Sequence, residues 1–62
     1  MTALEVEKRI IADGWFLVAQ VGSHRQYKHP AKLGKVTIPF HRKPKDLDKG
    51  TIASIFRQAG IK

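Results

Sequence analysis

The sequence of 62 residues contains no cysteine, so neither a disulfide bond nor a thiolate zinc site can stabilise the fold. No apolar run is long enough to cross a membrane, and no signal-peptide pattern precedes the first helix signal. We therefore expect a single small domain over residues 1–62 in a reducing cytosol. A chain of this length has no room for a deep cofactor cavity, and we expect no cofactor.

Acidic residues are absent from a long central stretch of the chain. Between Asp13 and Asp46 the sequence carries seven lysine or arginine residues and all three histidines, and the formal net charge is +7. Each phosphate that a basic side chain neutralises releases a condensed counterion, so this charge predicts a nucleic acid as the partner. The basic residues do not lie opposite an exposed apolar helix face, which argues against a membrane. Simple solubility is the alternative, but the concentration of charge in one segment favours binding.

The N-terminal segment has the signals of an amphipathic helix. Thr2 and Glu5 form a capping-box pattern, and Gly14 suits the left-handed residue after a helix. Apolar residues recur between them with helical spacing, at Ala3, Leu4, Val6, Ile10 and Ile11. They predict one apolar stripe. Glu7 falls inside this stripe, where we expect it to pair with a nearby cation.

Three strands are predicted after this helix. Residues 15–21 are rich in β-branched and aromatic side chains, and Gly22-Ser23 makes a tight connection into residues 24–29. Residues 30–34 form a turn, and residues 35–39 form the third strand.

Alternation along the second strand separates two sets of side chains. Tyr27 and Arg25 point to one side, and His24 and Lys28 point to the other. Because Tyr27 is the strong apolar anchor of this strand, its side should face the helices. His24 and Lys28 are then expected to share the open face of the sheet.

A second helix closes the chain. Asp48 is a good N-cap, and Gly60 ends the helix. The apolar stripe consists of Ile52, Ile55, Phe56 and Ala59. The predicted fold is therefore α+β, with the order α-β-β-β-α of a double-stranded-RNA-binding domain. It has a three-stranded antiparallel sheet with two helices on one face.

His24, after the Gly22-Ser23 turn, is the candidate catalytic residue. A neutral imidazole can take the proton of an RNA 2′-hydroxyl, whose oxygen then attacks the adjacent phosphorus without a metal. Arg25 and Lys28 would disfavour the imidazolium and support the charge on the phosphate. A lone histidine after a turn is more often an ordinary surface residue, so chemistry alone leaves the role open. His29 and His41 are possible acid partners for the leaving oxygen, although nothing in their spacing requires it, and His29 beside Pro30 is better explained as structural at a strand end.

Other basic residues are candidates for holding the RNA backbone. They are Lys32, Lys35, His41, Arg42, Lys43, Lys45 and Lys49. Three of the lysines gather before or at the start of the second helix, where free amides and the helix dipole favour an anion. No histidine spacing supports a metal site, and we expect no metal. Phe40 either stacks a base or, as we favour, packs under the second helix.

Several separated motifs together resemble one known family. They are Gly22-Ser23-His24 with Tyr27, the His29-Pro30 pair, residues 36–41, residues 46–51 and residues 55–61. In this order they resemble the HicA toxins, small toxins of bacterial type II toxin–antitoxin modules, over nearly the whole chain.

The resemblance implies a double-stranded-RNA-binding-like fold and an mRNA interferase, an endoribonuclease that cuts messenger RNA and arrests translation and growth. The essential histidine of that family maps onto His24. The implied partner is a HicB antitoxin, which we expect to cover the His24 face, and the implied location is the cytoplasm of a bacterium or archaeon. The alternatives are an RNA-binding module that blocks translation by occupancy, and a protein-interaction subunit whose charge complements an acidic partner.

Overall fold

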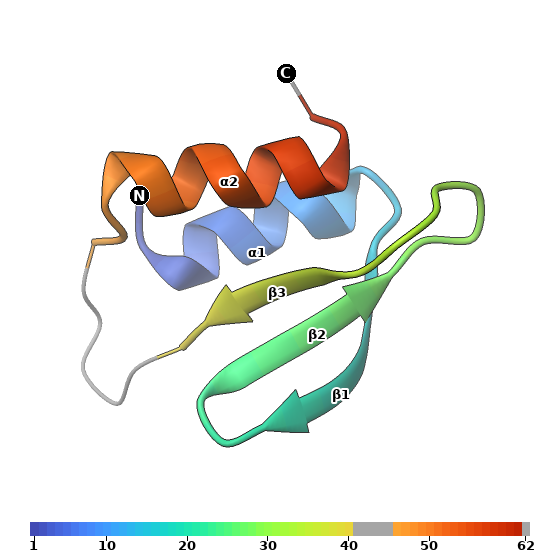
Figure 1. Cartoon of the computed structure of the whole chain (residues 1–62), viewed down its shortest axis with the longest axis horizontal. Coiled ribbons are helices and arrows are strands. Elements are labelled where there is room, and N and C mark those ends of the chain that lie inside the picture. Colours follow the sequence, from blue (N-terminus) through green and yellow to red (C-terminus); the bar gives the residue numbers. More distant parts are fainter. Residues whose placement is uncertain (41–45, 62) are drawn as a thin grey trace.

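A computed structural model describes residues 1–40 and 46–61. The elements, in chain order, are α1 (Ala3–Ala12), β1 (Phe16–Val21), β2 (His24–Lys28), β3 (Val36–Pro39) and α2 (Lys49–Ala59). The strands form one antiparallel sheet in the order β1-β2-β3, and both helices lie on one side of it (Figure 1). The predicted fold class is confirmed, and each strand is one residue shorter at one end than predicted. Neither described helix is long and apolar enough to cross a membrane.

Both helices begin at the predicted caps. The hydroxyl of Thr2 accepts the Glu5 N–H at 3.2 Å, and the Glu5 carboxylate accepts the Thr2 N–H at 2.9 Å. Asp48 accepts hydrogen bonds from the N–H and the hydroxyl of Thr51. These bonds lower the pKa of both carboxyl groups, chiefly through the Thr2 backbone N–H at Glu5 and the Thr51 hydroxyl at Asp48. The caps thereby satisfy amides that have no partner inside the helix.

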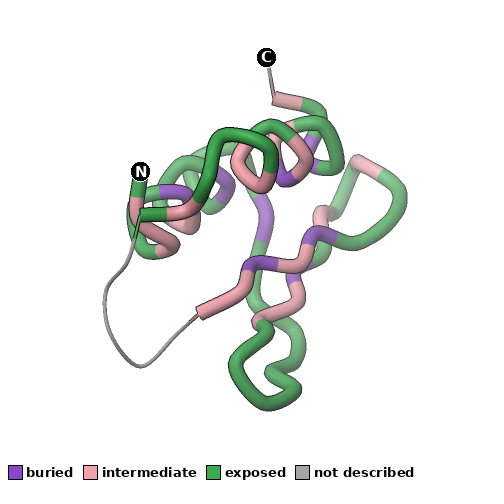
Figure 2. Tube along the Cα trace, turned by 60° about the vertical axis from the view of Figure 1, so that its left-hand side comes forward, coloured by how far each residue is buried: buried purple, intermediate pink, exposed green. Residues whose placement is uncertain are grey.

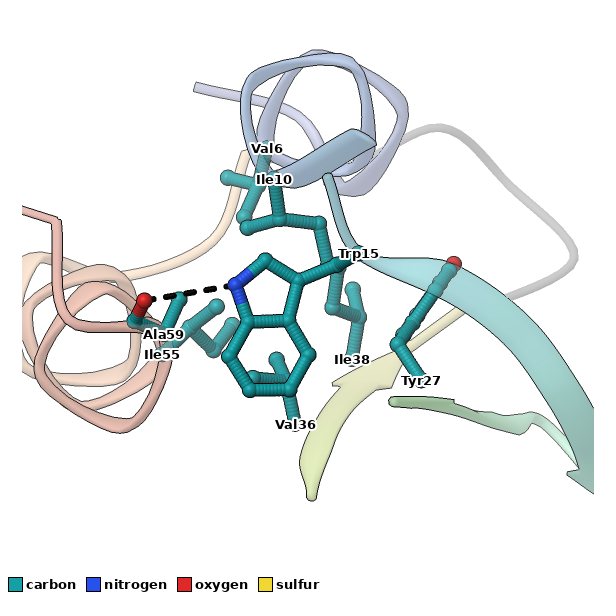
Figure 3. Packing of buried hydrophobic residues seen from close by; sticks show 8 residues of the cluster. All are labelled: Val6, Ile10, Trp15, Tyr27, Val36, Ile38, Ile55 and Ala59. Atoms are coloured by element: carbon teal, nitrogen blue, oxygen red, sulfur yellow. Dashed lines mark hydrogen bonds between the residues drawn. The ribbon is translucent and has the colours of Figure 1, made fainter. Parts of the chain in front are cut away.

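The core lies between the helices and the sheet (Figure 3). Its buried side chains are Val6, Ile10, Trp15, Tyr27, Val36, Ile38, Ile55 and Ala59. The indole N–H of Trp15 donates to the carbonyl oxygen of Ala59, the last residue of α2, at 3.2 Å. This bond ties the residue before β1 to the far end of the chain, so one tryptophan joins both helices to the sheet.

The apolar stripe of α1 is narrower than the sequence predicted. Val6 and Ile10 are fully buried, whereas Leu4 and Ile11 are 54% and 50% exposed. The reason is that α1 packs chiefly against β3 and α2, and Leu4 and Ile11 lie outside the part of the helix surface that these elements cover. The two flanking side chains remain in solvent.

The hairpin of β1 and β2 extends beyond the helices. Both helices pack on β3, and every residue of β1 is exposed (Figure 2). Tyr27 anchors the middle of the sheet because its ring is fully buried under the helices. The edge strand β1 therefore presents apolar side chains to solvent on both faces of the sheet.

Candidate nucleic-acid interface

The Gly22-Ser23 turn joins the end of β1 to the start of β2 and thereby places His24 at one end of the sheet. Gly22 has a φ of 60°, whereas no residue other than glycine in the described chain has a positive φ. A glycine of this kind at the first turn position is the pattern of a type II′ hairpin. The carbonyl oxygen of Ser23 accepts the N–H of Phe40 at 2.6 Å. The turn is thus tied to the end of β3.

His24 is the first residue of β2, the central strand. Its neighbours across the sheet are Val21 on β1 and Pro39 on β3. His24 is exposed and lies on the face opposite Tyr27, as predicted. Its imidazole is therefore accessible on the sheet face that the helices leave uncovered.

The register of the strands defines an open face on this side of the sheet. Directly opposed residues of an antiparallel pair point to the same side. The open face therefore comprises Phe16, Ala19, Val21, His24, Gln26, Lys28, Thr37 and Pro39. All five acidic residues of the chain lie on or beside the helices, and none lies in a strand. The open face carries an imidazole and one ammonium group with no carboxylate between them.

Arg25 lies on the other side of the sheet from His24. Its guanidinium Nη1 is 3.1 Å from the carboxylate of Glu7. Its Cζ lies over the ring of Phe40, 4.1 Å from the ring centroid. The hydroxyl of Tyr27 donates to the same carboxylate oxygen. Glu7 therefore has the cationic partner that the sequence predicted. The structure brings Lys28, but not Arg25, onto the face of His24.

This cluster also shifts two pKa values. The hydrogen bond from Arg25 to Glu7 raises the pKa of Arg25 further above its ordinary value. Burial, followed by the hydrogen bond to the Glu7 carboxylate, raises the pKa of the Tyr27 hydroxyl. Both groups thus keep their protons across the physiological range. Phe40 is partly buried and packs against the core, and the guanidinium of Arg25 lies over its ring.

His29 has a structural role at the end of β2. Its Nδ1 accepts the N–H groups of Ala31 and Lys32 at 3.0 and 3.1 Å, so Nε2 carries the hydrogen and donates to the carbonyl oxygen of Asp13 at 2.8 Å. The ring also meets Trp15 edge to face at 5.2 Å. With both nitrogens engaged, His29 is not placed to assist His24.

The lysines predicted to hold RNA fall into different environments. Lys32 pairs with Asp13, whose pKa is lowered mainly by that hydrogen bond, and donates to the Ala59 carbonyl oxygen at 2.9 Å. Lys32 therefore joins the C-terminal ends of the two helices. Lys35 and Lys49 are exposed, and Lys49 is the first residue of α2. The predicted sites at His41, Arg42, Lys43 and Lys45 lie outside the described residues.

In the described part of the chain, no three histidine or carboxylate side chains are grouped closely enough to hold a metal ion. The open face nevertheless has one feature that sequence reasoning missed. Phe16 stands directly across from Lys28 and is 49% exposed. The alternation that buries Trp15 would have placed Phe16 on the side of His24.

The fold and the open face together define a small basic α+β domain that presents one histidine beside a hairpin turn. The family model described as HicA toxin of bacterial toxin-antitoxin matches residues 3–61. The chain therefore belongs to the HicA toxin family, whose members are known as mRNA interferases and have a cognate HicB antitoxin. No protein with a curated description matches the chain.

Proposed function

We propose that this chain is an endoribonuclease that cuts messenger RNA with His24 as the general base and without a metal ion. The observation that carries the proposal is the exposed imidazole of His24 on the acid-free open face, in a chain of the HicA family. Lys28 lies on the same face of the same strand. An RNA strand on this face would meet a proton acceptor and a cation together.

From outside the RNA, the reaction needs only a proton acceptor and a proton donor. The neutral imidazole takes the proton of a 2′-hydroxyl, and the oxygen forms a bond to the adjacent phosphorus. The bond from phosphorus to the 5′-oxygen breaks, and water supplies the proton that this leaving oxygen takes up. The products are a 2′,3′-cyclic phosphate and a 5′-hydroxyl. A positioned base contributes about 10²–10⁴-fold to such a step.

Basic side chains would hold the RNA backbone around this site. Among the described residues, Lys28, Lys35 and Lys49 are exposed and suited to phosphate contacts. We give the same role to the basic connector residues His41, Arg42, Lys43 and Lys45. Arg25 and Lys32 are already held in ion pairs, so we assign them support of the sheet and of the helix ends.

The test compares three proteins on one transcript in excess EDTA. We expect the parent protein and a Gln58→Ala control, altered at an exposed position of α2, to cut the RNA at equal rates. His24→Ala should lower the rate by at least about 10²-fold while the melting temperature and the RNA affinity stay close to those of the parent. Equal cleavage by His24→Ala would overturn the role of His24.

A 2′-deoxy substitution tests the attacking group. A transcript-derived oligonucleotide that carries one 2′-deoxynucleotide at a mapped cleavage site should resist cleavage there and be cut elsewhere. Cleavage at the deoxy position would contradict attack by the 2′-oxygen. Intact RNA in every lane, with a shift on a native gel, would instead favour a module that blocks translation by occupancy.

A further inference from the structure

Phe16 gives the open face an exposed aromatic ring at the opposite end from His24. Its partner across the sheet is Lys28, and directly opposed side chains in a sheet stand about 4.5–5.5 Å apart at Cβ. Lys28 follows His24 by four residues along β2, or about 13 Å at ~3.3 Å per residue. A ring and an ammonium group therefore lie side by side, within reach of the histidine along one strand.

Between these two ends the open face carries Ala19 and two uncharged polar side chains, Gln26 and Thr37. Gln26 and Thr37 face each other across β2 and β3, and both are partly buried. An amide and a hydroxyl can pair with the edges of nucleobases, which offer both donors and acceptors. The open face thus combines a stacking surface, a phosphate contact and hydrogen-bonding groups.

We propose that Phe16 stacks on an unpaired base, so that the open face binds single-stranded RNA with its backbone beside Lys28. The inference rests on the proposed function, because it takes RNA as the partner of this face. In a duplex both faces of an internal base are covered by its neighbours, so Phe16 can stack only on a base that is unpaired. The fold, although it has the element order of a double-stranded-RNA-binding domain, would then select single strands near the site.

Charge favours RNA over a second copy of the chain as the occupant. Two copies, each with a formal net charge of +7, would repel one another across a face that carries no carboxylate. An RNA strand brings a negative charge at every nucleotide and a flat ring beside it. Aromatic side chains set next to cations are the usual platform for single strands.

Leu17 provides a matched control. It is the next residue on β1, is 48% exposed against 49% for Phe16, and pairs across the sheet with Tyr27 on the helical side. The two positions therefore share strand, exposure and apolar character, and differ in the face that they occupy. Leu17→Ala reports any general effect of trimming this edge strand.

The experiment measures RNA affinity in a His24→Ala background, which keeps the RNA intact. The probes are a fluorescein-labelled single-stranded oligonucleotide and the same sequence in a duplex. Phe16→Ala should weaken single-strand binding about 5- to 150-fold, as loss of one stacked base predicts, and should leave duplex binding unchanged. Phe16→Tyr should retain the affinity, Phe16→Leu should lose it, and Leu17→Ala should stay within about twofold of the background protein.

Two results would overturn the inference. One is an equal effect of Phe16→Ala and Leu17→Ala on single-strand binding. The other is loss of affinity for purified HicB antitoxin alone, which would assign the ring to the protein partner. If the parent protein cuts RNA through His24 while Phe16→Ala binds normally, only this inference fails. If Phe16 governs single-strand binding but the parent does not cut, only the proposed function fails.

Discussion

At the scale of single residues, Glu7 shows how a charged side chain within the apolar stripe of a helix can stabilise the fold. It lies between the helix and the sheet, where its carboxylate accepts hydrogen bonds from Arg25 and Tyr27. Its side chain is 12% exposed and that of Arg25 is 32% exposed, so solvent screens the pair only in part. Removing the carboxylate would leave a buried hydroxyl and a guanidinium without their common acceptor.

Glu7→Ala should therefore lower the free energy of unfolding by about 1–3 kcal/mol. The neighbouring exposed residue supplies the control, because Lys8→Ala should change the same quantity by less than about 0.5 kcal/mol. Urea denaturation followed by the fluorescence of Trp15 measures both. Similar small losses in the two variants would show that the cluster contributes little to stability.

For single residues, the sequence predicted correctly which side chains of β2 face the helices, because the alternation along one strand determines this. The placement of Tyr27 inward and of His24 with Lys28 outward follows from a period of two and one strong anchor. The proposed role of Arg25 beside the phosphate depended on nearness in sequence. The structure places that side chain with Glu7 because adjacent residues of a strand point to opposite faces.

At the scale of elements, the junction between α1 and β1 depends on a glycine. Gly14 has a φ of 109°, and a Cβ atom there would lie 2.7 Å from Nε2 of His29. His29 in turn holds the turn after β2 through Ala31 and Lys32. The first helix and the second strand are thus locked together at one point.

Gly14→Ala should destabilise the protein more than Gly34→Ala does. Both glycines have a positive φ, which costs an alanine about 1–2 kcal/mol, but nothing lies within 4 Å of a Cβ atom at Gly34. The clash with His29 should add about 1–3 kcal/mol at Gly14 alone. Thermal melting of the two variants gives the comparison, and equal losses would contradict the close approach.

The helix boundaries were accessible from the sequence because caps are local. Thr2 with Glu5, Asp48, and Gly60 each act on amides or carbonyls within a few residues of themselves. The exposure of β1 was not accessible in this way. Its residues have the composition of a buried strand, and only the position of the helices over β3 leaves them in solvent.

At the scale of the whole molecule, the chain combines a small core with a large positive charge. Eight side chains make up the buried apolar core of the described residues, which is little for a self-sufficient fold. The family implies a cognate HicB antitoxin. We expect this partner to present acidic groups and to cover the face of His24, and thereby to stabilise the toxin by mass action.

Free antitoxin at 100 times its dissociation constant should stabilise the toxin by about 2.7 kcal/mol. For a domain of this size, this corresponds to a rise of about 10–20 °C in the melting temperature. Differential scanning fluorimetry of the mixture would measure the rise. An unchanged melting temperature at saturation would argue that the antitoxin does not bind the folded toxin.

The sequence by itself determined the order of the elements, their caps, the inward side of β2 and the family, because these depend on local periodicity and on motifs contiguous along the chain. The tertiary structure decided which cations remain free and which aromatic ring is exposed. Arg25 and Lys32 found carboxylates from α1 and its end, Phe40 was covered by Arg25, and Phe16 was left on the open face. These outcomes depend on the contacts that form between residues distant in sequence when the helices pack on β3. Strand alternation alone does not predict such contacts.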